Sequence, residues 1–212
     1  AALMDPLPSS VGLVTAVNIT SSSAAAAADH PHQEEGVWLD GNRHCVFGVA
    51  CGHVILADLQ LAQNVYAYGC HDLVLDVSAG KVNHITLEAC ANCCLSYAGC
   101  IAGIELVSCR DVHLLCTGSG TDLLQCDLSC NVTSHGEVQP RNIVHSNNMS
   151  VQLGDYALPT SPYTEQRWTY FSHNQDRWIT LSTQPLRDRC GKGIVVLQEP
   201  EIKAKGRRRS VG

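Results

Sequence analysis

The chain has 212 residues, of which 45% are hydrophobic and 16% are charged, so its body is too apolar and too weakly charged for a disordered protein. No run of eighteen apolar residues is present, which excludes a membrane-spanning helix. The formal net charge is −6 although five of the 14 basic residues lie among the last ten positions, so the rest of the chain is more acidic than the total suggests. An acidic body argues against nucleic-acid binding, because phosphate contacts need a positive surface.

In chain order, the composition predicts a linker at 1–35, a folded body at 36–184 and a polar to basic tail at 185–212. The first part combines prolines with serine and alanine runs and has little capacity to form a core. The tail contains one short apolar run, 194–197, that is compatible with an added strand. Its basic cluster would suit an acidic partner or an anionic membrane, or would simply be a solvated end.

The body predicts β-strands and few helices, because apolar residues alternate in short runs bounded by Gly, Asn, Asp and Ser. With only two Phe in the chain, a core must be built from Val, Ile, Leu, Ala and Cys. The expected strands cover 54–59, 66–68, 73–77, 85–88, 104–107 and 112–115.

Four of these segments share a strand, a cysteine, a turn residue and a second strand. Their cysteines, at 70, 90, 109 and 126, are 20, 19 and 17 residues apart. A period near twenty is typical of a solenoid. We therefore predict an all-β fold, a right-handed parallel β-helix with rungs about 4.8 Å apart.

In such a coil the cysteines would form an interior column, since a free thiol behaves as a small buried hydrophobe. Asp72, Asn92 and Asp111 each follow a column cysteine by two positions. They would line one corner, where their side chains can bond backbone N–H groups.

Twelve cysteines raise the question of disulfides or metal. Cys90, Cys93 and Cys94 contain a C-x2-C spacing, but Cys93 and Cys94 would point to opposite faces of a strand, so we expect no metal site. The chain shows no secretory leader, so we expect a reducing cytoplasmic environment and free thiols, although stacked rungs would permit disulfides. Cys70-His71-Asp72 are consecutive, and neighbours on a strand diverge, so we expect neither a catalytic trio nor an enzyme.

The sequence resembles the C-terminal domain of cyclase-associated proteins, also called the CARP or cofactor C-like domain, over about residues 36–184. The most specific part is a Val-Tyr-x-Tyr-x-Cys segment followed at the right distance by Gly-Lys-x-Asn-x-Ile. The segments that carry the resemblance are 39–42, 61–70, 80–85, Cys90, 104–105, 110–112, 141–144, 149–151, 164–166 and 176–183.

The resemblance implies a β-helix whose C-terminal β-hairpin is exchanged in a homodimer. It also implies binding of monomeric actin, with a preference for the ADP form, and promotion of ADP replacement by ATP in a cytoplasmic, cytoskeleton-associated setting. No cofactor is implied. Residues that match family positions are, for actin binding, Lys81, Asn83, Glu105 and Asp127 and, for the exchanged hairpin of 168–183, Trp168, Trp178, Ile179 and Leu181.

Two other functions remain open. The related tubulin cofactor C domain acts on small GTPases through an arginine in a Gln-x-Arg strand motif, which Gln139-Pro140-Arg141 imitates, although Pro140 fits a central strand badly. Alternatively, the domain is a scaffold that kept the fold and lost actin affinity, with the basic tail as its working part.

The sequence departs from the family pattern in two places. The stretch 119–129 is about two residues shorter than the family pattern. Some 28 residues also follow the last family strand, where the family's free end is thought to help contact actin.

Overall fold

The computed structural model describes residues 35–160, 166–187 and 193–197, and in these ranges it contains fifteen strands and no helix. It therefore confirms the all-β prediction. The strands are β1 (Gly36–Asp40), β2 (Arg43–Phe47), β3 (Ala50–Ile55), β4 (Asn64–Tyr68), β5 (His71–Glu88), β6 (Ala91–Val107), β7 (Arg110–Thr121), β8 (Leu123–Asp127), β9 (Cys130–His135), β10 (Asn142–Ser146), β11 (Met149–Leu153), β12 (Tyr156–Ala157), β13 (Gln166–Ser172), β14 (Arg177–Arg187) and β15 (Gly193–Leu197).

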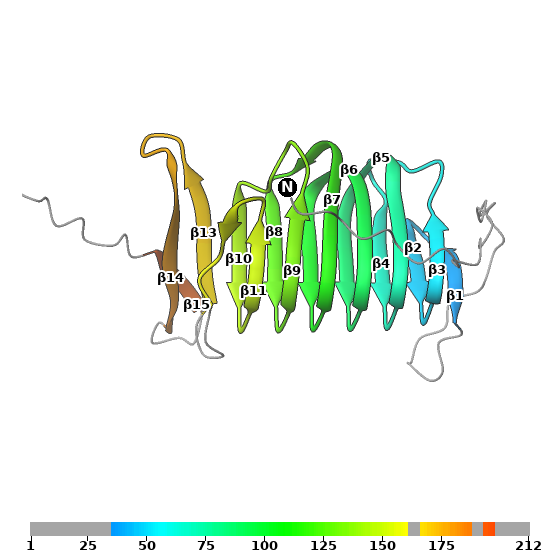
Figure 1. Ribbon diagram of the computed structural model, residues 1–212, viewed down its shortest axis with the longest axis horizontal. Helices are drawn as coiled ribbons and strands as arrows, with labels where there is room; N and C mark the ends of the chain where they lie inside the picture. The colour runs from blue at the N-terminus through cyan, green and yellow to red at the C-terminus, as the bar shows by residue number, and fades with distance from the viewer. Residues whose placement is uncertain (1–34, 161–165, 188–192, 198–212) are drawn as a thin grey trace, which may run out of the picture.

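The strands stack as a parallel β-helix, with successive rungs side by side along the long axis (Figure 1). We call sheet I the parallel stack of β2, β4, the second half of β5, the second half of β6, β8 and β10. Sheet II is the stack of β3, the first half of β5, the first half of β6, β7, β9 and β11. The long strands β5 and β6 run through both sheets, so one hydrogen-bonded ladder follows the coil around its corner.

Antiparallel strands close both ends of sheet I. At the first rung, β1 folds back on β2 through a turn at Gly41, which has a φ of 59°. At the last rung, β13 pairs with β10, and β14 and β15 continue the sheet outward. The apolar run at 194–197 thus forms part of an added strand. Every edge strand of a parallel stack exposes unpaired backbone groups, and these hairpins cover them.

The core lies between the two sheets and consists mainly of Val, Ile, Leu and Cys, as the composition predicts. Pairs such as Ile85 and Ile104, or Leu87 and Leu106, occupy the same position on adjacent rungs and are at most 1% exposed. Tyr97 is the largest fully buried side chain. The expected strand at 54–59 is shorter than predicted, because β3 ends at Ile55 and Asp58 adopts a positive φ of 57° in the turn that follows.

The corner between sheets I and II repeats the same backbone on each rung. On every rung, the residue just before the column position has a left-handed φ, and so does the residue two places after it, with values of 48–63°. The column position itself is buried and faces inward. The first left-handed set is Gly48, Gly69, Ala89, Ser108, Leu128 and Asn147, and the second is Cys51, Asp72, Asn92, Asp111, Asn131 and Ser150.

The predicted cysteine column is correct for Cys70, Cys90 and Cys109, each 1% exposed, but wrong for Cys126. Cys126 pairs with Leu106 inside sheet I, and Ser129 takes the next place in the column. The prediction places the fourth column residue 17 positions after Cys109. In the structure it lies 20 positions after Cys109, so the rung length stays near twenty residues.

The corner residues also bond differently from the prediction. Their side chains bond one another along the stack, not backbone N–H groups. Asn92 Nδ2 donates to Asp72 Oδ1, and Asn131 Nδ2 donates to Asp111 Oδ1 at 2.8 Å.

The predicted linker at 1–35, except for Glu35, the basic cluster of the tail and Cys190 lie outside the described residues. Over the described part of the chain, no helix is long and apolar enough to cross a membrane.

Candidate functional site

The outer face of sheet I begins with an aromatic cluster at the first rungs. Trp38 of β1 stacks on Phe47 at a centroid distance of 4.8 Å, and Phe47 meets Tyr66 edge-on at 5.4 Å and Tyr68 at 5.7 Å. These rings lie on outward positions of β1, β2 and β4, where the pleat alternates inward and outward side chains. Tyr68 is 42% exposed, so the cluster presents aromatic surface to solvent.

Tyr66 connects this cluster to the next rung. Its hydroxyl donates to Glu88 Oε2 at 2.6 Å, and burial together with this bond raises the pKa of Tyr66 well above its usual value. The guanidinium of Arg43 lies over the Tyr66 ring, 5.7 Å from its centroid. A cation over an aromatic face is held by the ring quadrupole, so Arg43 and Tyr66 fix each other's position.

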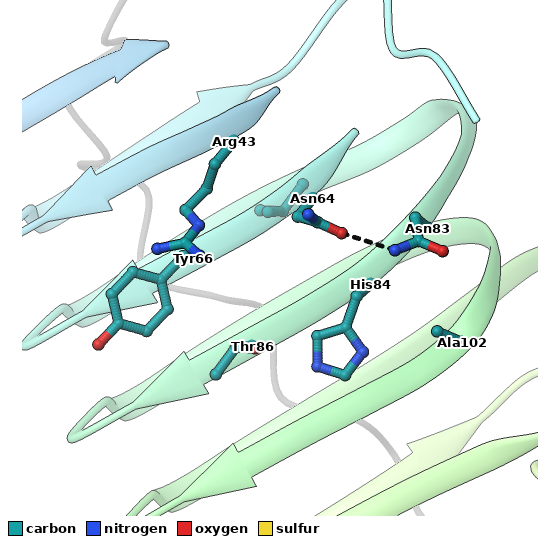
Figure 2. A pocket seen from close by; sticks show the side chains of 8 residues that line it. Arg43, Asn64, Tyr66, Asn83, His84, Thr86 and Ala102 are labelled. Carbon is teal, nitrogen blue, oxygen red and sulfur yellow. Dashed lines mark hydrogen bonds between the residues drawn. The ribbon is translucent and has the colours of Figure 1, made fainter. Parts of the chain in front are cut away.

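Beside Tyr66 the surface is hollowed into a depression of about 370 Å³ (Figure 2). Asn83 Nδ2 donates to Asn64 Oδ1 at 2.9 Å along one side, and His84 lies next to them. A hollow with an amide pair, an imidazole and a guanidinium at its rim suits a polar side chain of a partner. Its lining residues are Arg43, Asn64, Val65, Tyr66, Asn83, His84, Thr86 and Ala102.

Further along the same face, an acidic network spans four rungs, from β5 to β10. His84 Nε2 lies 3.6 Å from Glu105 Oε2, and Gln125 Nε2 donates both to Glu105 Oε1 at 3.3 Å and to Asp127 Oδ2 at 2.8 Å. Ser146 Oγ donates to Asp127 Oδ1 at 2.5 Å. The carboxylates are thus held at fixed positions by neutral donors, which leaves their negative charge available to a partner.

The structure brings three of the four predicted contact residues to this surface. Glu105 and Asp127 are joined through Gln125, and Asn83 lies at the edge of the hollow, one residue before His84. Lys81 is exposed at the corner that leads into this rung, beside Gly99 of the next rung. Sequence reasoning missed Arg43, Asn64 and His84, because only the stacking of residues 19 to 21 positions apart places them together.

The hairpin predicted at 168–183 is present as β13 and β14, joined by a turn at 173–176. Trp178 stacks on Tyr156 of the same chain at 5.2 Å and packs against the core, and Leu181 is 3% exposed. Trp168 and Ile179 are half-buried on the side of the hairpin that continues the outer face of sheet I. Trp168 Nε1 donates to Asn142 Oδ1 at 3.3 Å.

The cysteines are free thiols throughout the described residues. Cys93 is buried and Cys94 is half-buried on the opposite face, as alternation on a strand predicts, so the C-x2-C spacing does not converge. Inside the column, the hydrogen bonds that the Cys90 thiol donates to Cys109 and Cys70 raise its pKa far above the usual value. The Cys90 thiol is therefore a neutral packing group.

Gln139-Pro140-Arg141 does not form the strand motif of a GTPase regulator. The three residues lie in the connection between β9 and β10, and the Gln139 side-chain amide donates to Gly136 O at 3.1 Å. Arg141 is exposed at the end of this connection. The geometry gives the tubulin cofactor C interpretation no support.

Residues 34–135 match the sequence family described as "Adenylate cyclase associated (CAP) C terminal". Cyclase-associated protein 1 of Arabidopsis thaliana is 36% identical over 66 residues, 31% of this chain and 14% of that protein. Adenylyl cyclase-associated protein of Dictyostelium discoideum is 27% identical over 99 residues, 46% of this chain and 21% of that protein. The matched parts thus span a small fraction of these relatives.

A crystal structure of cyclase-associated protein from Cryptosporidium parvum superposes with a TM-score of 0.51, at 20% sequence identity, and covers 72% of this chain and 97% of that chain. At this identity the likeness establishes the fold alone. The fold, the sequence-family match and the two relatives agree, and residues 34–135 of the chain are therefore similar to the C-terminal domain of the cyclase-associated protein family.

Proposed function

We propose that this domain binds monomeric actin through the outer face of sheet I and promotes the exchange of actin-bound ADP for ATP. The observation that carries the proposal is the family match over residues 34–135, which includes every strand of this face from β1 to β8. The aromatic cluster, the hollow and the acidic network then supply the chemistry of a docking surface: rigid rings, an amide pair and fixed carboxylates.

The proposed action is binding without covalent catalysis. A protein that binds the open-cleft form of actin more tightly than the closed form shifts the population toward the open form, by no more than its differential affinity. Nucleotide then leaves and enters faster. Glu105 and Asp127 would meet basic groups of actin, while Lys81 and Asn83 would contact it at the corner beside the hollow.

The direct test is the exchange of a fluorescent ATP analogue onto ADP-actin in the presence of the full 212-residue chain. We expect faster exchange with the wild-type protein. The double variant Glu105→Lys/Asp127→Lys should bind ADP-actin at least about tenfold more weakly, because like charges facing each other across an interface cost more than about 1.4 kcal/mol.

Glu137→Lys is the matched control, since Glu137 is an exposed acid in the connection between β9 and β10, outside both sheets. It should exchange nucleotide like the wild type. If the wild-type protein does not bind ADP-actin at tens of micromolar, the proposal is wrong, and the domain is better described as a scaffold. If both variants weaken binding equally, a diffuse charge effect replaces the proposed face.

A further inference from the structure

A second group of reactive side chains lies at the corner between sheets I and II, away from the face described above. Cys51, His71 and Asp72 are all exposed, and one ligand atom from each lies within 4.8 Å of the other two. His71 Nδ1 is 3.1 Å from Asp72 Oδ2, and Cys51 Sγ is 3.8 Å from the same oxygen. Among the described residues this is the one such group of three ligand types.

The fold holds these side chains in place before any ligand arrives. Cys51 and Asp72 occupy the same corner position on the first and second rungs, and both have left-handed backbones, with φ values of 52° and 53°. The register pairs Ala50 with His71, and His71 N donates to Val49 O at 3.1 Å. The left-handed turn at Asp72 is also what makes His71 and Asp72 converge, contrary to the expectation that strand neighbours diverge.

The spacing suits a small tetrahedral cation. Zinc bonds of about 2.0–2.3 Å to N, O and S place donor atoms roughly 3.2–3.7 Å apart. The separations of His71 Nδ1 and Cys51 Sγ from Asp72 Oδ2, 3.1 Å and 3.8 Å, are close to that range. A thiolate, an imidazole and a carboxylate are the three ligand types that zinc takes most often in proteins.

We propose that Cys51, His71 and Asp72 form a surface site for Zn²⁺ or a divalent cation of the same class. Three protein ligands leave the fourth tetrahedral position to water. On binding, the Cys51 thiol releases its proton to solvent, and the resulting thiolate and the Asp72 carboxylate together neutralise the cation.

A neighbouring side chain orients the carboxylate. Asn92 Nδ2 donates to Asp72 Oδ1, so that Oδ2 is the oxygen turned toward Cys51 and His71. Outer hydrogen bonds of this kind hold a ligand in its productive orientation. Asn92 is therefore a positioning residue for the site.

The same corner two rungs further along shows what the site requires. There Asn92, Arg110 and Asp111 replace Cys51, His71 and Asp72, and Arg110 Nε lies 3.3 Å from Asp111 Oδ2. The backbone is the same, but a guanidinium and an amide cannot ligate zinc. The chain therefore contains a matched corner without metal-binding chemistry, which serves as an internal control.

The test is a titration of the full, EDTA-treated chain with Co²⁺ in a non-thiol reductant, followed by displacement with Zn²⁺. We expect a thiolate-to-cobalt charge-transfer band that saturates at one equivalent and disappears when Zn²⁺ is added. Cys51→Ser should abolish the band, His71→Ala should weaken binding strongly, and Asn92→Ala should weaken it about tenfold or more.

Cys130→Ser and Asp111→Asn are the controls, because Cys130 is half-buried near the matched corner and Asp111 belongs to it. Both should titrate like the wild type. Thermal melting followed by circular dichroism verifies that each variant is folded. A band that persists in Cys51→Ser, or that depends equally on Cys130, would overturn the proposal, as would the absence of any saturable binding by the wild type.

Discussion

At the scale of single residues, the interior column shows how a β-helix satisfies its corner. Cys70 and Cys109 each place a thiol within 3.4 Å of a carbonyl oxygen of the preceding rung, those of Val46 and Leu87. Ser129 continues the column with a hydroxyl, and Asn148 closes it with an amide that donates to Cys126 O at 2.8 Å. Side chains that differ in chemistry thus perform the same task, the donation of a hydrogen bond to a carbonyl oxygen one rung back.

Ser129 offers a direct measure of that task. Its Oγ accepts a hydrogen bond from Cys109 N at 3.1 Å, and its one proton is shared between Asp127 O at 2.9 Å and Leu106 O, one rung back, at 3.4 Å. The residue is 1% exposed. Ser129→Ala leaves a buried N–H without its acceptor, so the free energy of unfolding should fall by about 1–3 kcal/mol in urea denaturation. Ser129→Cys, which repeats the chemistry of the column, should lose less.

Ser96→Ala is the control, because Ser96 lies half-buried on the outer face of β6. Its effect should stay within about 0.5 kcal/mol, as is usual for surface positions. An equal loss in both variants would mean that the column bonds contribute nothing specific.

Thiol labelling gives a second prediction at this scale. Cys51 is exposed and Cys94 half-buried, whereas burial raises the pKa of the Cys45 thiol to about 11. A higher pKa means less thiolate at pH 7.5, and the thiolate is the reactive form. We therefore expect alkylation of the native, EDTA-treated protein to modify Cys51 first. Cys94 should react more slowly, because burial raises its pKa as well, and Cys45 should react only after unfolding. Peptide mass spectrometry measures the order.

Cys130, half-buried on sheet II, serves as an intermediate reference in the same experiment. Rapid native labelling of Cys45 or of the buried Cys90 would show that the core opens on the timescale of alkylation. That outcome would contradict a closed β-helix.

These residues also mark what the sequence could and could not predict. Cys70, Cys90 and Cys109 predict the column correctly, because they are the same residue type at a regular period. Ser129 and Asn148 also belong to the column, but they are not cysteines. The cysteine spacing therefore assigns Cys126, and not Ser129, to the fourth place. The sequence does not predict the site of Cys51 and His71 for a related reason. These residues are 20 positions apart, and only the register between β3 and β5 shows that they are neighbours.

At the scale of the element, the repeated corner is the feature on which the stacking depends. Its first left-handed position is Gly in the first two rungs and then Ala89, Ser108 and Leu128, with φ values of 52–54°. A left-handed backbone costs a residue with a Cβ roughly 1–2 kcal/mol, which glycine avoids at the expense of greater chain entropy in the unfolded state. The later rungs therefore carry strain that the ladder of inter-rung hydrogen bonds outweighs.

Ala89→Gly should relieve that strain. Gly69 occupies the equivalent position one rung earlier with a φ of 63°, so the substitution repeats a residue that the corner already accepts. The balance of the two effects predicts a gain of about 0.5–1 kcal/mol in the free energy of unfolding. Ala91→Gly, two residues later and outside the left-handed region, is the control and should destabilise; a loss of stability in both variants would argue against strain at Ala89.

The sequence predicts which segments form strands better than it predicts where each strand begins and ends. Alternating apolar residues identify the strands of both sheets, because one face of each strand is buried. They do not show that β5 runs from His71 to Glu88 without a break, or that β3 ends at Ile55. Those boundaries depend on the positive φ of Asp58 and on the register shift between Val77 and Lys81, and neither can be read from the order of apolar residues.

At the scale of the whole molecule, the coil is an elongated object with distinct surfaces. The outer face of sheet I carries the aromatic cluster and the acidic network, while the corner opposite Lys81 carries Cys51, His71 and Asp72. One end is closed by β1 and the other by the hairpin of β13 and β14 (Figure 1). The aromatic cluster and the hairpin lie at opposite ends of the coil, so a second copy of the chain could join at the hairpin without covering the aromatic cluster (Figure 1).

The hairpin is the part of the molecule through which we propose that two copies assemble, by exchange of β13 and β14. Trp178 packs against Tyr156 and the core within a single chain, and an exchanged hairpin would make the same contacts with a partner's core. Half-buried Trp168 and Ile179 on the outward side would gain burial only in the dimer. Light scattering on the purified chain should thus give about twice the monomer mass of 22.8 kDa.

The double variant Trp168→Ala/Ile179→Asp should shift that mass to the monomer while a cooperative melt is retained, because it removes the apolar surface that only the dimer covers and places a charge there. Phe171→Ala removes a ring that meets Trp178 at 5.5 Å on the opposite side of the hairpin, and it separates loss of intrachain packing from loss of the interface. If the wild type is monomeric at tens of micromolar, or if the double variant remains dimeric, the hairpin is an end cap of a single chain and the proposed actin-binding face acts in a single copy.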